Sequence, residues 1–324
     1  MIDFRYHLVS IVSIFMALAV GIVLGAGPLK EDIGTRVTEQ ATALRADKAQ
    51  LRTELDAATA GTSARDKFAS IVAPTVMKDQ LTGKTVALVI APGADADLVK
   101  STTASLTMAG ATVGSTITLT DAWADPATRT VRNTLTNRVA ALVKAPVVAS
   151  SPDELAADQL AATVLARAIL AGNGQATDRH ISSANAALDA LQTGDLVKSS
   201  PDQIVLSSSV VFLGGQVKGS TPQDVDARLA AYVQLVGSMD AGGSGVVVAT
   251  ETNTTDRTQS ADLVAAVRKS SDAVKIASTV DNADLPMGQS TLVLALAQQY
   301  AGSSGQYGLA PDAKAVLPDI TAKQ

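Results

Sequence analysis

An uninterrupted apolar run lies near the start of the chain. Residues Leu8 to Leu29 (LVSIVSIFMALAVGIVLGAGPL) contain no charged side chain over 22 positions. Roughly 20 apolar residues, each rising about 1.5 Å along a helix, span the hydrocarbon core of a bilayer. Phe4 and Tyr6 precede the run, where aromatic side chains commonly meet the membrane interface. The pattern predicts a transmembrane helix over residues 8–29 after a short stub, residues 1–7.

A cleaved signal peptide is the alternative, because small residues stand at Ala26 and Gly27. The apolar run is longer than the usual signal core of about 7–15 residues, and Pro28 directly follows the small residues. Both features favour an uncleaved anchor. The charges flanking the run do not decide its orientation, although a short cytoplasmic stub with the long domain translocated is the commoner arrangement.

Small residues recur every fourth position inside the run, at Ala17, Gly21 and Gly25. Such a stripe lets two membrane helices approach closely, and it predicts a homodimer. The alternative is that glycine and alanine are simply frequent in membrane helices.

A heptad pattern follows over residues 30–62. Apolar or small residues alternate at spacings of four and three, while charges of both signs occupy the other positions, as in a solvated coiled coil. The predicted seam consists of Val37, Ala41, Leu44, Lys48, Leu51, Leu55 and Ala58. Alanine and lysine make this seam weak, so an amphipathic helix packed on its own domain remains the alternative. We expect the helix to end near Gly61.

From residue 68 to residue 324, apolar runs typical of strands alternate with helical patterns. The predicted strands are Thr85–Ala91, Thr112–Leu119, Ser209–Leu213, Gly245–Thr250 and Val274–Ser278. The predicted helices are Asp95–Ala109, Pro222–Ser238, Ser260–Lys269 and Gln289–Tyr300, with a largely helical insertion over residues 126–191. Uncharged strands between amphipathic helices predict an α/β domain with a Rossmann-like, mostly parallel sheet covered on both faces.

Composition excludes several classes of function. The net charge is −5 and only 3% of residues are aromatic, which argues against nucleic acid as a partner. The absence of cysteine excludes disulfides, zinc–thiolate sites and cysteine nucleophiles. His7 and His180 are the two histidines, too few for a multi-histidine metal site in one protomer.

Glycine-containing loops follow two predicted strands, at Gly93 and at Gly214-Gly215. Neither loop matches G-x-G-x-x-G or a Walker loop. A phosphate could approach the second loop, but a plain turn into the next helix is the favoured interpretation.

Two further groups of residues are candidate sites. His180 stands at a helix start among polar neighbours and is interpreted as a solvated cap rather than a ligand. Asp281, Asn282 and Asp284 form an acidic cluster after the last predicted strand, suited to calcium, to a partner's amines or, more simply, to helix capping. No G-x-S-x-G elbow is present. We therefore predict no catalytic, cofactor-binding or metal-binding residues.

Two segments carry a family resemblance: MIDFRYHLVSIVSIFMALAVGIVLGAG at the start and STVDNADLPMGQSTLVLALAQQYAGSSGQYG near the end. Together with the short heptad region they resemble the actinobacterial MctB copper transporter family, which includes the SteB-like cell-separation proteins. The resemblance implies a plasma-membrane anchor with the N-terminus in the cytoplasm and the main domain outside. It implies two functions: copper tolerance, or control of cell separation together with a SteA-like partner and the coiled coil of a RipA-type peptidoglycan hydrolase.

The side chains available as copper ligands help to decide between copper tolerance and cell separation. Copper(I) prefers thiolate or thioether ligands and copper(II) prefers imidazoles. Beyond the anchor the chain offers one histidine and four scattered methionines, Met77, Met108, Met239 and Met287. One apolar helix also encloses no polar path. The sequence thus favours a dimeric, non-enzymatic envelope adaptor over copper transport, with a nucleotide-binding enzyme as a weaker third hypothesis.

Overall fold

A computed structural model describes residues 4–26, 29–145, 154–172, 178–201, 203–252 and 260–319. The chain divides into two compact units, Met1–Arg65 and Asp66–Gln324, and each is considered by itself. Residues 1–3 of the predicted stub, and residues 27–28 of the predicted membrane span, lie outside the described part.

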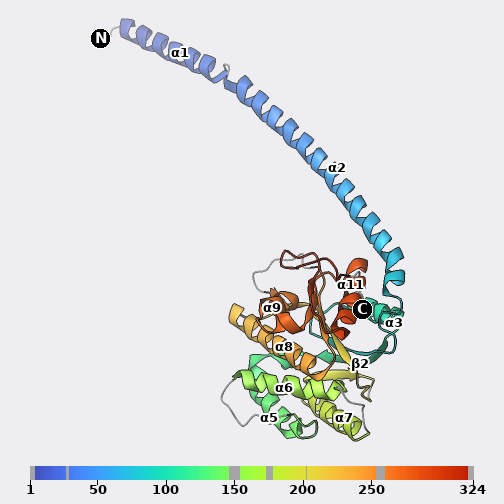
Figure 1. Ribbon diagram of the computed structural model, residues 1–324. Helices are drawn as coiled ribbons and strands as arrows, with labels where there is room; N and C mark the ends of the chain where they lie inside the picture. The colour runs from blue at the N-terminus through green and yellow to red at the C-terminus, as the bar shows by residue number, and fades with distance from the viewer. Residues whose placement is uncertain are drawn as a thin grey trace. The chain divides into compact units, whose positions relative to one another are not determined.

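Two helices account for the described residues of the first unit (Figure 1). Helix α1 covers Phe4–Ala26, and α2 begins at Leu29 and ends at Met77 within the second unit. The expected end near Gly61 is therefore wrong. A glycine inside a helix costs only about 1 kcal/mol, and the hydroxyl of the neighbouring Thr62 bonds back to the carbonyl of Ala58 within the helix.

A seven-stranded sheet forms the centre of the second unit, in the order β3-β2-β1-β4-β6-β8-β9. Its strands are β1 (Thr85–Ile90), β2 (Thr112–Leu119), β3 (Val197–Ser200), β4 (Ser209–Leu213), β6 (Val246–Ala249), β8 (Ser278–Val280) and β9 (Gln306–Tyr307). All neighbours pair in parallel except β2 and β3. The parallel strands follow a doubly wound order that reverses between β1 and β4.

Helices cover both faces of this sheet (Figure 1). Helices α3 (Ala96–Met108) and α11 (Pro286–Tyr300) pack on one face, where the end of α2 contributes Ala73 and Met77. Helices α8 (Pro222–Gly242) and α9 (Leu263–Lys269) pack on the other. Alternate residues of each strand therefore enter different cores, Val86 and Leu88 into one and Ala87 and Val89 into the other. The predicted α/β class with a mostly parallel sheet is confirmed.

The predicted helical insertion consists of short helices on the α8 face. They are α4 (Asp121–Ala124), the 3-10 helix η1 (Pro126–Thr128), α5 (Arg129–Ala140), α6 (Glu154–Ile169) and α7 (Asp178–Thr193). Arg132 on α5 pairs with Asp158 on α6, and both side chains are almost fully buried. The same guanidinium donates to the carbonyl of Ala122 at 3.1 Å. One arginine thus connects three parts of the insertion.

Two element predictions are wrong in detail. The expected strand Val274–Ser278 is instead a helical turn, α10 (Ala273–Ile276), and β8 starts at Ser278. The expected helix at Ser260 begins with a strand, β7 (Ser260–Asp262), which pairs with β5 (Gln216–Lys218) in a separate ribbon. Asp262 then caps α9 by accepting from the N–H groups of Val264 and Ala265.

The start of α11 packs so closely on the loop after β8 that it requires glycine. A Cβ added at Gly288 would lie 1.8 Å from the carbonyl oxygen of Asn282. We expect Gly288→Ala to lower the free energy of unfolding by about 1–3 kcal/mol through overpacking, measured by urea unfolding. The matched control is Gly237→Ala in α8, where a Cβ would meet nothing within 4 Å. That variant should be neutral or slightly more stable; equal losses in both would contradict the explanation.

Candidate functional site

The reversal of strand order between β1 and β4 is the usual place for a ligand in such a sheet. Here the two loops that follow these strands lie against each other. A Cβ on Gly215 would lie 2.2 Å from the carbonyl oxygen of Gly93, and Ala91 N–H donates to Leu213 O at 2.8 Å. Close backbone packing thus accounts for the glycine at 215 without a phosphate.

Carboxylates gather near the carboxyl ends of three strands. Asp95 follows β1, Glu251 follows β6 and Asp284 follows β8. Burial raises the pKa of Glu251, and repulsion by Asp95 and Asp284 raises it further. Asp284 accepts from the N–H and the hydroxyl of Thr252, at 2.7 and 2.9 Å. Among the described residues, however, no three histidine or acidic side chains stand close enough to share a metal ion.

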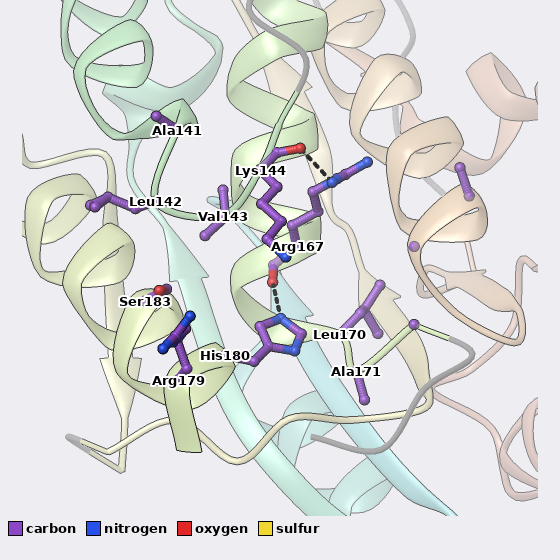
Figure 2. Close-up of a pocket in the computed structure, with 13 residues that line it drawn as sticks. Ala141, Leu142, Val143, Lys144, Arg167, Leu170, Ala171, Arg179, His180 and Ser183 are labelled. Atoms are coloured by element: carbon purple, nitrogen blue, oxygen red, sulfur yellow. Dashed lines mark hydrogen bonds between the residues drawn. The ribbon is translucent and has the colours of Figure 1, made fainter. Parts of the chain in front are cut away.

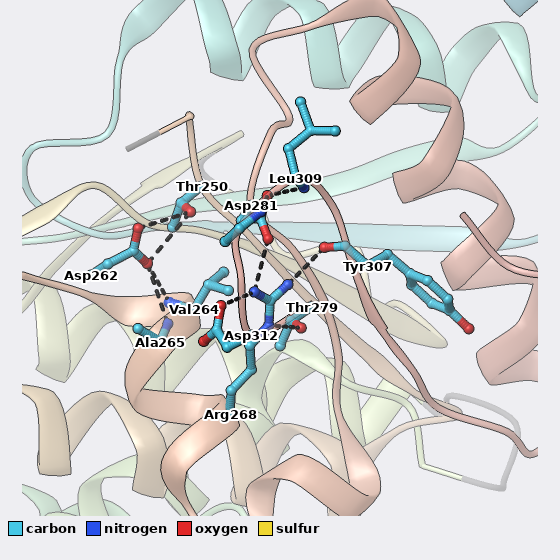
Figure 3. A network of polar contacts seen from close by, with 11 residues as sticks. Thr250, Asp262, Val264, Ala265, Arg268, Thr279, Asp281, Tyr307, Leu309 and Asp312 are labelled. Atoms are coloured by element: carbon cyan, nitrogen blue, oxygen red, sulfur yellow. Dashed lines mark hydrogen bonds and ion pairs between the residues drawn. The ribbon is translucent and has the colours of Figure 1, made fainter. Parts of the chain in front are cut away.

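Asp281 serves the fold rather than a ligand (Figure 3). One carboxylate oxygen lies 2.8 Å from Arg268 Nη1, and the other accepts from Leu309 N–H at 2.7 Å. The guanidinium also donates to Asp312 at 2.9 Å and to the carbonyl of Tyr307 at 2.7 Å. The two parts of the C-terminal motif, around Asp281 and Tyr307, are therefore held together by Arg268, which the sequence did not single out.

The expectation of helix capping by this cluster is wrong. The residue that caps α11 is Leu285, with no side-chain hydrogen bond, and Asp284 holds Thr252 instead. Asn282 is fully buried, and neither of its side-chain amide atoms has a protein partner. Its backbone accounts for its position, because its carbonyl is the atom that meets Gly288.

Asp262 is a half-buried acid with a clear pH consequence (Figure 3). Burial raises its pKa, although hydrogen bonds from Val264 and Ala265 oppose that rise. A raised folded-state pKa stabilises the fold below the ordinary aspartate pKa of about 3.9, and this contribution is lost as pH rises through the folded value. We therefore expect the stability of the native chain, relative to an Asp262→Asn variant, to fall from about pH 4 to pH 7, measured by urea unfolding. A pH-independent difference would contradict this.

His180 lines a cavity (Figure 2). Its half-buried ring approaches the carbonyl of Arg167, with Nε2 at 3.3 Å, and it is the third residue of α7, so it is not the cap of that helix. Lys144, Arg167 and Arg179 line the same cavity and were not predicted. The available signal was Arg167, a single charge within the apolar stretch LAATVLARAILAG.

The predicted dimerisation residues lie on the two N-terminal helices. The span Phe4–Gly25 has a mean hydropathy of 2.6 and is long and apolar enough to cross a membrane. Around Gly21 and Gly25, nothing within the chain lies within 4 Å of an added Cβ. On α2 the apolar members of the seam are exposed: Val37 by 57%, Leu44 by 68%, Leu51 by 64% and Leu55 by 65%. Ala41, Lys48 and Ala58 lie on the same helix; the pairing itself stays a prediction.

These features define a membrane protein with one apolar N-terminal helix among the described residues and a doubly wound α/β domain. The chain belongs to the MctB family. Residues 1–318 match the model of that family, described as "Copper transport outer membrane protein, MctB". Proteins named "Copper transporter MctB" from Mycobacterium tuberculosis and Mycobacterium bovis are 26% identical to it over 321 residues, covering 98% of this chain and 99% of theirs.

Proposed function

We propose that this chain is a membrane-anchored copper-tolerance protein of the cell envelope, of the kind that its mycobacterial relatives are named for. The supporting observation is the extent of the similarity, since the family match covers residues 1–318. The match therefore includes the anchor, the long helix and the α/β domain together, rather than a single domain that many unrelated proteins contain. The proposal includes the orientation that the resemblance implies, with the N-terminus in the cytoplasm and the main domain outside.

The methionine thioethers of the second unit are its soft candidate ligands for copper, and their exposure decides whether an ion could reach them. Met77 and Met239 are buried in the two cores, at 3% and 0% exposure, while Met108 is 46% exposed. Soft ligands that are sealed in a core do not meet an ion arriving from solvent. We therefore assign the protein a role in the copper tolerance of the cell envelope. We do not assign a copper-binding site to any of its residues.

A deletion strain tests this proposal. Loss of the gene should lower growth at raised copper and increase cell-associated copper, and the full chain expressed from a plasmid should restore both. Unchanged tolerance and unchanged copper content in the deletion strain would overturn the proposal. Calorimetry of the full chain with Cu(I) and Cu(II) then determines whether the ion is held by this protein itself.

A second candidate is a dimeric, non-enzymatic adaptor in cell separation, acting with a SteA-like partner and the coiled coil of a RipA-type hydrolase. The observation that favours it is the exposed apolar seam of α2, at Leu44, Leu51 and Leu55. Exposed apolar residues at heptad spacing are suited to pairing with another helix. Chained, unseparated cells in the deletion strain without copper sensitivity would favour this function over the first.

Single cysteines test the pairing, because the native chain has none. In membranes under oxidation, Leu44→Cys and Leu51→Cys should each yield a disulfide-linked dimer, since seam residues of a parallel pair face each other. Thr53→Cys, on the outer side of the same helix, is the matched control and should remain mostly monomeric. A Gly21→Ile substitution in the anchor should reduce the crosslinked fraction. Failure of crosslinking at both leucine positions would exclude the seam.

A further inference from the structure

A cavity of about 500 Å³ lies inside the helical insertion (Figure 2). Its walls come from the segment after α5, the last turn of α6, the first turns of α7 and the end of α8, at Ala241 and Gly242. The volume is within the range of small-molecule sites, roughly 300–1,000 Å³. The cavity is also remote in sequence from the loops at the carboxyl ends of β1 and β4.

The charges around the cavity have one sign. Lys144, Arg167 and Arg179 line it beside the ring of His180, and no aspartate or glutamate is among its described lining residues. The acid adjacent to Arg179 in sequence, Asp178, lines a separate depression of the surface.

The cations of this cavity differ from the ion-paired arginines of the same unit. Elsewhere in the described residues, Arg132, Arg228 and Arg268 each face a carboxylate within 3.5 Å. Lys144, Arg167 and Arg179 form no such pair with any described residue. Cations that converge on one cavity without a counter-ion repel one another, and an anion bound between them would remove that cost.

Local contacts hold these groups in place. Arg167 Nη1 donates to the carbonyl of Lys144 at 2.6 Å, which fixes one end of the guanidinium and leaves its other donors for a ligand. His180 contacts the carbonyl of Arg167 at 3.3 Å (Figure 2). Both Arg179 and His180 belong to the first turn of α7, where the helix dipole adds positive potential.

The rest of the lining is apolar. Val143 and Leu170 form a buried part of the wall, at 6% and 2% exposure, and Leu142 is 44% exposed. A ligand that fits would therefore combine an anionic head with a short apolar portion. We propose that this cavity binds a small organic oxyanion, a phosphate or a carboxylate, with Arg167 and Arg179 as its principal charged contacts.

Calorimetry of the full chain in detergent tests the site with phenyl phosphate and benzoate, and with benzyl alcohol as the neutral analogue. We expect saturable one-to-one binding of at least one anion and none of the alcohol. The double variant Arg167→Gln/Arg179→Gln should weaken binding about tenfold or more, because it removes both guanidinium groups that donate charge-assisted hydrogen bonds to the anion. Arg138→Gln, an exposed arginine of α5 outside the cavity, is the matched control and should bind like the native chain.

A second arm separates the sources of such an anion. Dihexanoyl phosphatidic acid, used below its micelle-forming concentration, is compared with phenyl phosphate. Tighter binding of the lipid assigns the site to a membrane headgroup, and equal or weaker binding assigns it to a free small molecule. The proposal is overturned if neither anion binds better than benzyl alcohol, or if the double variant keeps its native thermal stability and native affinity.

Discussion

Replacing Asp281 by alanine is expected to lower the free energy of unfolding by about 3–5 kcal/mol, because it removes one partner of a buried ion pair. The carboxylate lies 2.8 Å from Arg268 Nη1, and the two side chains are 7% and 4% exposed. It also accepts from the backbone N–H groups of Leu309 and Ala310, at 2.7 and 3.2 Å. Without it, two backbone donors lose their acceptor and Arg268 keeps only Asp312 as an acidic partner among the described residues.

Urea unfolding followed by the fluorescence of Trp123, the single tryptophan, measures this loss. The matched control is Asp312→Ala, which removes the other carboxylate from the same guanidinium. Asp312 is 48% exposed, so solvent already screens its charge and we expect a loss of about 1 kcal/mol or less. Similar losses in the two variants would mean that burial of the Asp281 pair does not set its contribution.

The second large effect is expected at Asp158, the buried partner of Arg132. Asp158→Ala should lower the free energy of unfolding by about 3–5 kcal/mol, because Arg132, at 1% exposure, would remain charged inside the insertion. Arg129 also approaches this carboxylate, at 3.4 Å, so a second cation loses its contact with Asp158. Since the segment after α5 and the last turn of α6 both line the cavity, the same variant should weaken binding of an anion there.

Two variants separate the charge effect from a general packing effect. Asp189→Ala removes an exposed acid from α7 and should change stability by no more than about 0.5 kcal/mol. The double variant Arg132→Met/Asp158→Leu replaces the whole pair with apolar groups of similar size, and it should recover much of the loss. A double variant as unstable as Asp158→Ala would show that the ion pair is not the source of the effect.

The fold class followed from the sequence where burial is complete. Strands such as β1 and β4 consist of uncharged, mostly branched residues, because helices cover both of their faces, and this pattern has few alternatives. The missed strand β3, with the sequence VKSS, lies at an edge and carries a lysine and two serines. Its extended form depends on pairing with β2, which no local pattern encodes.

Errors at element boundaries have similar causes. Gly61 was interpreted as a helix end, yet a single glycine does not stop a helix whose neighbours on both sides form helix. The residues around Val274 and Lys275 alternate in a way that fits a strand. In the structure, Ala273 and Ala277 instead pack in the core through a single helical turn.

The cavity could not be predicted from the sequence for a different reason. Lys144, Arg167 and Arg179 are separated by 23 and 12 positions and lie after α5, on α6 and on α7, so only the packing of these helices brings them together. In contrast, the seam on α2 is a property of one helix, and its spacing is readable without knowledge of the fold.

The position of β9 in the chain has a consequence for biosynthesis. Gln306 and Tyr307 form the last strand among the described residues, and they pair with the edge of β8. Until they emerge, that edge is unpaired, and an open edge is a template for association between chains. At about 5–20 residues per second, the rest of the sheet can form before this strand arrives. A nascent or truncated chain that stops before residue 306 is therefore the form of this protein most prone to aggregate.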